Sequence, residues 1–156
     1  MSAEAKRSKP FVRLATREDC LILAQTMREE DIEECRLTLG LSAEQSLLLS
    51  FRLGETFTIQ WGDEVVAMFG HYGAPGIYGV PWMLASPLLP KIAKSFLKEC
   101  RVYVQALLEV YGHLENYVWV ENGVHVKWLQ WLGFEFDRPA PYGIEDQLFQ
   151  RFYMKE

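Results

Sequence analysis

The sequence LENYVWVEN-GVHVKWLQWL-GFEF, which runs from Leu114 to Phe136, decides the fold of this chain. Residues Tyr117–Val120 form an apolar run that is too short for a helix and rich in β-forming side chains, which indicates a buried strand. Val124, Trp128 and Leu132 then recur at helical spacing, and Gly133 stands where a helix usually ends. The stretch therefore predicts a strand, an Asn-Gly turn, a helix of about ten residues and a second strand.

The chain before this stretch reads as short helices followed by strands. Caps, glycines and apolar spacing predict, in order, a strand at Phe11–Ala15, a helix from Thr16 to about Met27, a helix that ends at Gly40 and a helix from Ser42 to about Gly54. The strand pattern then predicts a hairpin of Thr56–Trp61 with Glu64–Gly70, a connection at His71–Gly76 and a strand at Ile77–Ala85.

The longest predicted helix covers Leu88 to Tyr111, because apolar residues keep a three-four spacing through it and Gly112 follows. After the opening stretch we expect a loop at Arg138–Gly143 and a last strand at Gln147–Met154. Pro81 lies inside the Ile77–Ala85 strand and cannot donate to a β-ladder, so it predicts a bulge, a splayed edge or a plain edge strand there.

The composition is that of one folded domain. The chain has 156 residues, of which 49% are hydrophobic and 13% aromatic, enough for a sizeable core. We expect a flexible tail at residues 1–9 and a single domain at residues 10–156. No apolar run is long enough to span a bilayer and the N-terminus lacks the apolar region of a signal peptide, so the expected location is the cytoplasm.

Charge and cysteine content exclude several function classes. The formal net charge of −5 argues against general nucleic-acid binding, which needs clustered Lys and Arg. Cys20, Cys35 and Cys100 are widely spaced within helical patterns, so they encode neither a disulfide framework nor a zinc motif and read as core residues. No metal site is expected.

The order of the predicted elements resembles that of the GNAT superfamily of N-acetyltransferases. The resemblance implies an α+β fold with a central, mostly antiparallel sheet of six or seven strands and helices on both faces. It also implies that the strands ending near Ala85 and starting near Glu115 are parallel neighbours, joined by the long helix. In this superfamily the two strands splay apart and admit the pantetheine arm of acetyl-CoA, which would explain Pro81.

A second resemblance is more specific. The segments YGVPWMLAS (78–86), NYV (116–118) and WLQWLGF (128–134), with Asn122, are similar to a family of small proteins from short-tailed bacteriophages that are described as internal virion proteins or GNAT-like acetyltransferases. The likeness covers roughly Phe11 to Met154. It implies a phage protein in the host cytoplasm or the virion, with phage or host proteins as partners and an oligomeric state that the sequence does not give.

The resemblance to GNAT enzymes also assigns a cofactor cleft between Trp82–Ser86 and Tyr117–Asn122, with Leu89–Ile92 at its mouth. The residues assigned to acetyl-CoA are Trp82, Met83, Leu84, Ser86, Leu89, Lys91 and Asn122. The turn before the long helix nevertheless lacks the glycines that expose backbone N–H groups to pyrophosphate, and two prolines remove donors there. Ser86 could cap the helix. We therefore expect weak or absent binding of acetyl-CoA.

The catalytic positions are similarly incomplete. In many GNAT enzymes a Tyr seven residues after the strand-end Asn protonates the CoA thiolate, and the corresponding residue here is Leu129, which cannot donate a proton. Asn122 remains suited to the amide arm of the cofactor or is only a turn former. Candidate catalytic residues are His71, Asn122 and His125, and Glu115 and Glu121 are further candidate bases, each with an alternative reading as an ordinary polar residue.

Two charged groups have two readings each. The acidic cluster Glu29, Glu30, Asp31, Glu33 and Glu34 either attracts a cationic amine or solvates a helix start. The basic stripe Lys91, Lys94, Lys98 and Arg101 either meets a phosphate or an acidic partner, or is a solvated face.

Three functions follow: a non-catalytic phage virion or assembly protein, an acetyl-CoA-dependent N-acetyltransferase, or a protein that binds and inhibits a host protein. The incomplete phosphate turn and Leu129 favour the first over the second.

Overall fold

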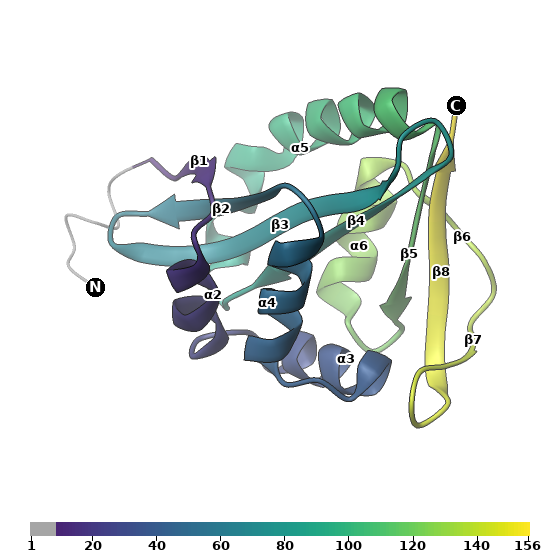
Figure 1. Ribbon diagram of the computed structural model, residues 1–156, viewed down its shortest axis with the longest axis horizontal. Coiled ribbons are helices and arrows are strands. Elements are labelled where there is room, and N and C mark those ends of the chain that lie inside the picture. The colour runs from purple at the N-terminus through teal and green to yellow at the C-terminus, as the bar shows by residue number, and fades with distance from the viewer. Residues whose placement is uncertain (1–8) are drawn as a thin grey trace.

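The computed structural model describes residues 9–156, which form five helices and eight strands (Figure 1). The tail predicted for residues 1–9 therefore lies, apart from Lys9, outside the described residues. The elements are β1 (Phe11–Leu14), α2 (Arg17–Ala24), α3 (Glu29–Leu39), α4 (Ala43–Leu53), β2 (Thr56–Trp61), β3 (Glu64–Ala74), β4 (Tyr78–Ala85), α5 (Leu89–Tyr111), β5 (His113–Trp119), α6 (Gly123–Leu132), β6 (Glu135–Phe136), β7 (Ala140–Tyr142) and β8 (Gln147–Lys155).

The strands form one sheet in the order β1-β2-β3-β4-β5-β8-β6, and β7 also pairs with β8. All pairs are antiparallel except β4 with β5, which are parallel as predicted. Helices α2 and α4 pack against β3 on one face, and α5 packs against β3, β4 and β5 on the other, where it also contacts α6 (Figure 1). The predicted α+β architecture with helices on both faces is confirmed.

Local signals in the sequence account for most helix ends. Thr16 with Asp19 and Ser42 with Gln45 form the predicted capping boxes, in which each side chain bonds the backbone N–H of the other residue. Helix α5 ends at Gly112, which adopts φ +76°, a left-handed conformation that glycine takes without a steric cost. Helix α2 is shorter than predicted and ends at Ala24 rather than near Met27.

Two segments predicted as loops contain strand residues. Strand β3 continues through the predicted connection to Ala74, because its backbone stays in register with β4 as far as the pair Ala74 and Tyr78. The predicted Arg138–Gly143 loop contains β7, which pairs with β8 and brings the sheet to eight strands rather than six or seven. Both extensions depend on a partner strand, which local composition does not reveal.

Strands β4 and β5 separate almost as soon as they meet. Their one paired position in the described chain is Gly79 with Leu114, and beyond it the two strands diverge. Pro81 stays in register with His71 of β3, so no bulge forms on that side, and β4 is not an edge strand. The carbonyl of Pro81 points toward β5, so its missing N–H also faces the gap between β4 and β5. The splayed-strand reading of Pro81 therefore agrees with the structure.

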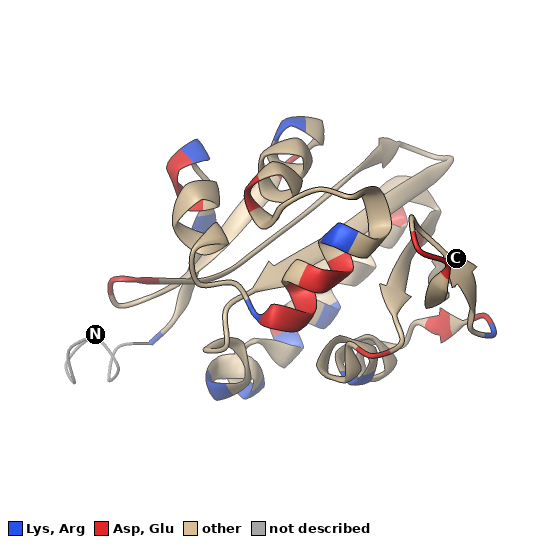
Figure 2. Ribbon diagram, turned by 90° about the horizontal axis from the view of Figure 1, so that it is seen from below, with Lys and Arg blue, Asp and Glu red and all other residues tan. Residues whose placement is uncertain are grey.

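Three clusters make up the core. One joins α2 and α4 to β3, a second joins α5 to β5, β8 and α6, and a third lies under the first half of α5. Acidic residues gather on α3 (Figure 2). Within residues 9–156, no helix combines the length and apolarity that a membrane span requires.

Candidate functional site

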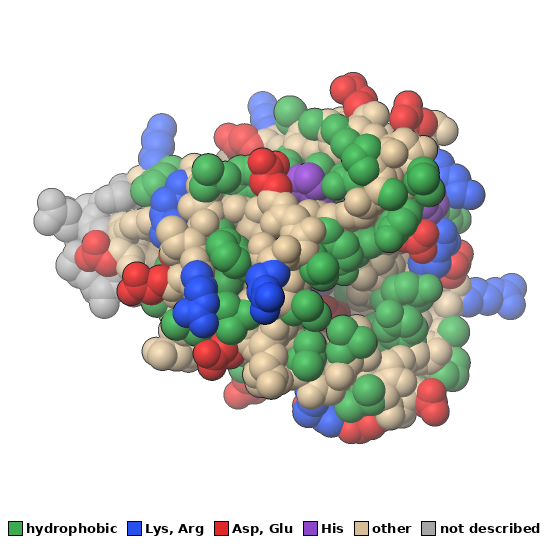
Figure 3. Space-filling model, in the orientation of Figure 1, with side chains coloured by type: hydrophobic (Ala, Val, Ile, Leu, Met, Phe, Trp, Pro, Cys, Tyr) green, Lys and Arg blue, Asp and Glu red, His purple; other side chains and the backbone are tan. Residues whose placement is uncertain are grey.

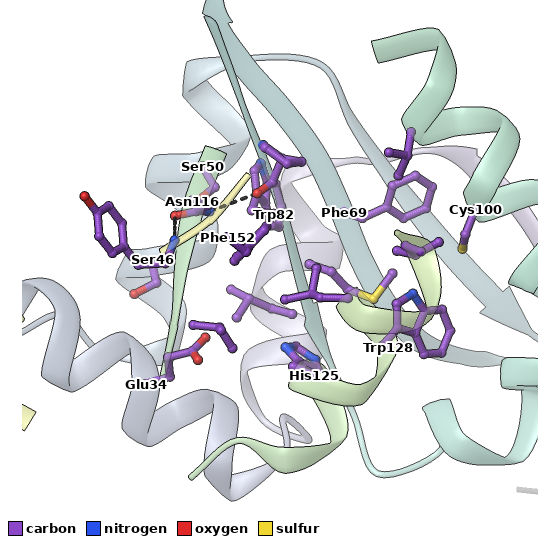
Figure 4. A pocket seen from close by; sticks show the side chains of 18 of the residues that line it. Glu34, Ser46, Ser50, Phe69, Trp82, Cys100, Asn116, His125, Trp128 and Phe152 are labelled. Carbon is purple, nitrogen blue, oxygen red and sulfur yellow. Dashed lines mark hydrogen bonds between the residues drawn. The ribbon is translucent and has the colours of Figure 1, made fainter. Parts of the chain in front are cut away.

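A cavity of about 510 Å³ extends through the sheet at the gap between β4 and β5. Residues of α3 and α4 line it on one face of the sheet, and residues of α5 and α6 line it on the other. Figure 3 shows one face of the molecule hollowed, with hydrophobic side chains around the hollow. Figure 4 shows Trp82, Phe152 and Asn116 toward one end of the cavity and Phe69 and Trp128 toward the other.

Several of the backbone groups that the diverging strands leave unpaired are capped by other groups of the chain. The Asn116 side chain donates from Nδ2 to the Pro81 carbonyl at 2.9 Å, and its Oδ1 accepts from the Tyr117 N–H at 2.8 Å. Further along the gap, Ala85 N–H donates to a carboxylate oxygen of α3 at 2.9 Å, and the Trp119 N–H donates to another at 2.8 Å. These four contacts occupy strand-edge groups that an extended ligand would otherwise use.

A buried polar cluster fastens α3 to the end of the gap. Arg28 and Asp31 form an ion pair at 3.0 Å, and their side chains are 5% and 0% exposed. Asn122 joins them, because its Oδ1 accepts from both terminal nitrogens of Arg28 at 3.3 Å and its Nδ2 donates to Asp31 at 2.9 Å. The backbone N–H of Arg28 also donates to the Ala85 carbonyl at 2.8 Å. Every charged group here has a partner, as buried charges require.

Glu34 lines the cavity at the edge of this cluster. Burial raises the pKa of its carboxyl to about 8, and the nearby charge of Asp31 adds to the rise, while the hydrogen bonds from Trp119 and Asn122 oppose it. A carboxyl with a pKa near 8 is largely protonated at neutral pH and can exchange a proton there. Glu34 is therefore the acid–base group best placed in the cavity.

His125 also lines the cavity, as one of the predicted catalytic residues. It is 9% exposed and lies on α6, with Nε2 3.6 Å from a carboxylate oxygen of Asp31, too far for a hydrogen bond. Burial lowers its pKa, although the charge of Asp31 opposes the change. Its Nε2 is one of the few buried side-chain polar atoms of the described chain without a partner. Figure 4 shows His125 and Glu34 toward the same end of the cavity.

The predicted cofactor residues divide into two groups. Trp82, Met83 and Leu84 line the cavity where the cleft was expected, as do Tyr117 and Val118 on the opposite strand. The remaining predicted residues, Ser86, Leu89, Lys91 and Asn122, lie outside its lining.

The prediction that placed Leu89 at the mouth of the cleft is wrong. Its side chain is 0% exposed in the core under α5, because the apolar stripe of that helix turns it toward the sheet. Asn122 is fully buried and held by Arg28 and Asp31. Ser86 is not the N-cap of α5. That position belongs to Leu88, whose N–H donates to the Ser86 hydroxyl at 3.3 Å.

The turn before α5 offers few backbone donors. Ser86 N–H donates to Val66 at 2.8 Å, and Leu88, Leu89 and Lys91 N–H groups all donate to acceptors within the turn at 3.0–3.3 Å. Pro87 and Pro90 have no N–H. From Ser86 to Lys91, therefore, no backbone N–H is free to bind a phosphate oxygen, and the helix start lacks the usual features of a phosphate site.

The other predicted bases lie outside the cavity lining. His71 is on β3, where Nδ1 lies 2.7 Å from the Tyr111 hydroxyl and Nε2 lies 3.3 Å from Glu55. Glu115 contacts Arg151 at 3.0 Å, which helps to lower its pKa against the opposing effect of burial. Glu121 is exposed. None of these three is among the residues that line the cavity.

The structure bears differently on the acidic cluster of α3 and on the basic stripe of α5. Asp31 does not solvate a helix start, because it is completely buried and paired with Arg28, so that reading is wrong for this residue. The basic stripe is exposed, and Arg101 stacks on Trp131 at 3.7 Å from the ring centroid, which fits a solvated face. Leu129, at the expected position of the proton donor, lines the cavity. In the described chain, no three His, Cys, Asp or Glu side chains are placed to hold a metal ion.

The sequence did not reveal the roles of Arg28 and Asn116. Arg28 read as part of a charged interruption, although it is 5% exposed, and Asn116 read only as part of a motif. A polar residue inside an apolar strand is the one local signal that could have identified Asn116, because such a side chain needs a nearby partner.

Solved structures of N-acetyltransferases are similar to this chain. An N-acetyltransferase from Staphylococcus aureus Mu50 gives a TM-score of 0.70 at 13% identity, over 95% of this chain and 99% of that one. Spermidine N-acetyltransferase from Vibrio cholerae in complex with CoA and spermine gives 0.67 at 12% identity, over 96% of both chains. Its dodecameric intermediate state gives 0.62 at 13% identity, over 96% of this chain and 95% of that one. The chain has the GNAT fold.

At the sequence level, the family described as "Bacteriophage T7, probable scaffold protein Gp13" matches residues 55–139. That range covers more than half of the chain and includes β4, α5, β5 and α6, which surround much of the cavity. No curated protein matches the sequence.

Proposed function

The chain belongs to the bacteriophage family described as T7 probable scaffold protein Gp13, and on that premise we propose that it is a GNAT-fold phage assembly protein without efficient acetyl transfer. It acts through its surface, by binding other phage proteins or a host protein. Its place of action is the host cytoplasm, with incorporation into the virion where its partner is a virion component.

One observation carries this proposal: the turn before α5 has no free backbone donor. The N–H groups of Ser86, Leu88, Leu89 and Lys91 are used within the protein, and the two prolines have none. A pyrophosphate held at a helix start depends on such donors, because each charge-assisted hydrogen bond contributes about 1.5–3 kcal/mol. Without them acetyl-CoA should bind weakly or not at all.

Two further observations support the same conclusion. Asn116 and the α3 carboxylates already occupy four of the strand-edge groups along the gap. Leu129 stands where a proton donor for the thiolate would be needed. General acid catalysis is typically worth about 10²–10⁴-fold, so its loss leaves at most a slow reaction.

The surface offers hydrophobic material for protein contacts. Exposed apolar side chains occur on several elements; those of Leu14 in β1, Leu39 in α3, Ile77 beside β4 and Val102 in α5 are each at least 63% exposed. Apolar side chains in this number are compatible with protein interfaces, although single exposed residues are common on any surface.

Calorimetric titration with acetyl-CoA and with CoA tests the cofactor part of the proposal. We expect no binding in the low-micromolar range. Low-micromolar or tighter affinity for acetyl-CoA would favour the acetyltransferase function over the assembly function.

A second experiment tests the assembly part. An affinity-tagged copy is expressed during infection, and phage particles and assembly intermediates are separated by sedimentation. Recovery of the protein with either fraction supports the proposal. A third experiment incubates the purified protein with labelled acetyl-CoA and host lysate. Robust labelling of one defined target would overturn the proposal if Glu34→Gln abolishes the labelling and the exposed substitution Glu44→Gln does not.

An acetyl-CoA-dependent N-acetyltransferase is the second candidate, and Glu34 is the observation that favours it. Its carboxyl lines the cavity and has a pKa of about 8, which suits a base that deprotonates an amine. The similar Vibrio cholerae enzyme was solved with CoA and spermine. In this case Glu34→Gln should reduce the rate constant of acetyl transfer by about 10²-fold or more.

A further inference from the structure

The cavity has the form of a passage rather than a shallow cleft. It is lined by α3 and α4 on one face of the sheet and by α5 and α6 on the other, and Leu84 of β4 and Val118 of β5 are among its lining residues. Its volume of about 510 Å³ falls within the range of small-molecule sites. A passage of this kind suits a ligand that is longer than it is wide.

The walls are mainly apolar and carry no positive charge. Aliphatic and aromatic side chains from both faces form most of the surface, and no Lys or Arg is present among the described residues that line it. The acidic groups at the wall are Glu34, which is largely protonated at neutral pH, and Glu99, and Asp31, paired with Arg28, lies behind His125. An anionic head would therefore find no cation in the wall, and an ammonium head would lose its hydration in an apolar passage.

Polar atoms without partners occur along this passage. The described chain has four buried side-chain polar atoms that make no hydrogen bond, and three of them belong to residues that line the cavity: Trp82 Nε1, Tyr103 Oη and His125 Nε2. A buried donor or acceptor without a partner costs about 1–3 kcal/mol, so native proteins usually satisfy it. His125, at 9% exposure, is the most deeply buried of the three.

We propose that the passage binds an aliphatic chain with one uncharged hydrogen-bonding head, in the class of fatty alcohols. The chain would fill the apolar length of the passage, and the head would lie at the end where Glu34 and His125 line it. Such a ligand needs neither a pyrophosphate turn nor free strand edges. The proposal goes beyond the assembly role and does not depend on it, since either can fail while the other stands.

A chain-length series of 1-alkanols from hexanol to decanol tests the proposal, with binding followed by calorimetry. Each added methylene should tighten binding about fourfold until the passage is full, because burying one CH₂ contributes about 0.8 kcal/mol, which corresponds to that factor. Absence of binding, or affinity independent of chain length, would overturn the proposal.

Head-group selectivity is tested at one chain length. Octanol should bind at least tenfold more tightly than octanoate or octylammonium at neutral pH. An equal or higher affinity for either ion would show that the head is not selected as uncharged.

Blocking variants locate the site. Cys100 lines the passage from α5, so Cys100→Trp should weaken decanol binding at least tenfold, and Val102→Trp, at a 70% exposed position of the same helix, should leave it unchanged. Leu129→Trp blocks from α6 and serves if the first variant does not fold, as judged by circular dichroism. Unchanged binding in a folded blocking variant would overturn the proposed location.

Discussion

Asn116 Nδ2 donates to the carbonyl oxygen of Pro81 across the gap between β5 and β4, at 2.9 Å. The same side chain accepts from the Tyr117 N–H, so one amide replaces two hydrogen bonds that a continuous parallel ladder would supply. The gap is thereby closed by the protein's own groups at this level, and the cavity that remains is bounded by side chains.

Replacement of Asn116 should destabilise the fold. In Asn116→Ala the Pro81 carbonyl and the Tyr117 N–H lose their partners, which should lower the free energy of unfolding by about 1–3 kcal/mol. Urea denaturation measures the change. Gln130→Ala, an exposed substitution on α6, should change it by no more than about 0.5 kcal/mol, and equal effects of the two variants would show that the bridge contributes nothing.

Gly79 should tolerate no side chain. A Cβ at this position would lie 2.3 Å from Cδ2 of Tyr111, so Gly79→Ala must displace the ring or separate β4 from α5. We expect a loss of about 1–3 kcal/mol or more. Gly123→Ala is the matched control, because nothing lies within 4 Å of the new Cβ and alanine favours a helix. The check is the midpoint temperature of thermal unfolding. A value for Gly79→Ala equal to or higher than that for Gly123→Ala would contradict this packing.

The raised pKa of Glu34 makes stability depend on pH. The folded state holds the Glu34 proton up to a pH of about 8, whereas the unfolded chain releases it near 4.5. The folded state therefore binds more protons in this window, and its advantage is lost as the pH rises through about 8. From pH 4 to 9, the free energy of unfolding should fall by about 2–5 kcal/mol more in the parent than in Glu34→Gln. Urea denaturation at pH 5, 7 and 9 measures this. A difference in the free energy of unfolding between the parent and Glu34→Gln that stays constant across these pH values would refute the prediction.

Restoring donors at the start of α5 should improve binding of CoA. Pro87→Gly with Pro90→Ala supplies two N–H groups near the helix start, and each one that reaches a phosphate oxygen should tighten binding about tenfold. Calorimetry with CoA measures the gain. Pro139→Ala, in an exposed loop, should leave the affinity unchanged. A double variant that folds but gains no affinity would show that missing donors are not what limits CoA binding.

Much of the fold could be predicted because its signals are local. The capping boxes at Thr16 and Ser42 and the glycine after Tyr111 act within a few residues of where they stand, and each was placed correctly. The three-four spacing of apolar residues likewise predicted the long helix α5 itself. Strand β7 was missed because a three-residue strand exists only through its partner.

The site was predicted in part. The sequence placed Trp82, Met83 and Leu84 beside the gap, and the structure puts all three in the cavity wall. It did not show that Asn122 is held by Arg28 and Asp31, more than ninety positions away in the chain. Such pairings depend on how α3 packs over the sheet, and a carboxylate in an acidic run looks the same whether water or an arginine surrounds it.

The sequence by itself thus determined the order and type of most elements and the absence of glycines in the turn before α5, because each is written in neighbouring residues. Only the tertiary structure decided which polar groups are buried and what they bond. Asn116 bridges two strands and Glu34 acquires a raised pKa because segments distant in sequence remove water from them together.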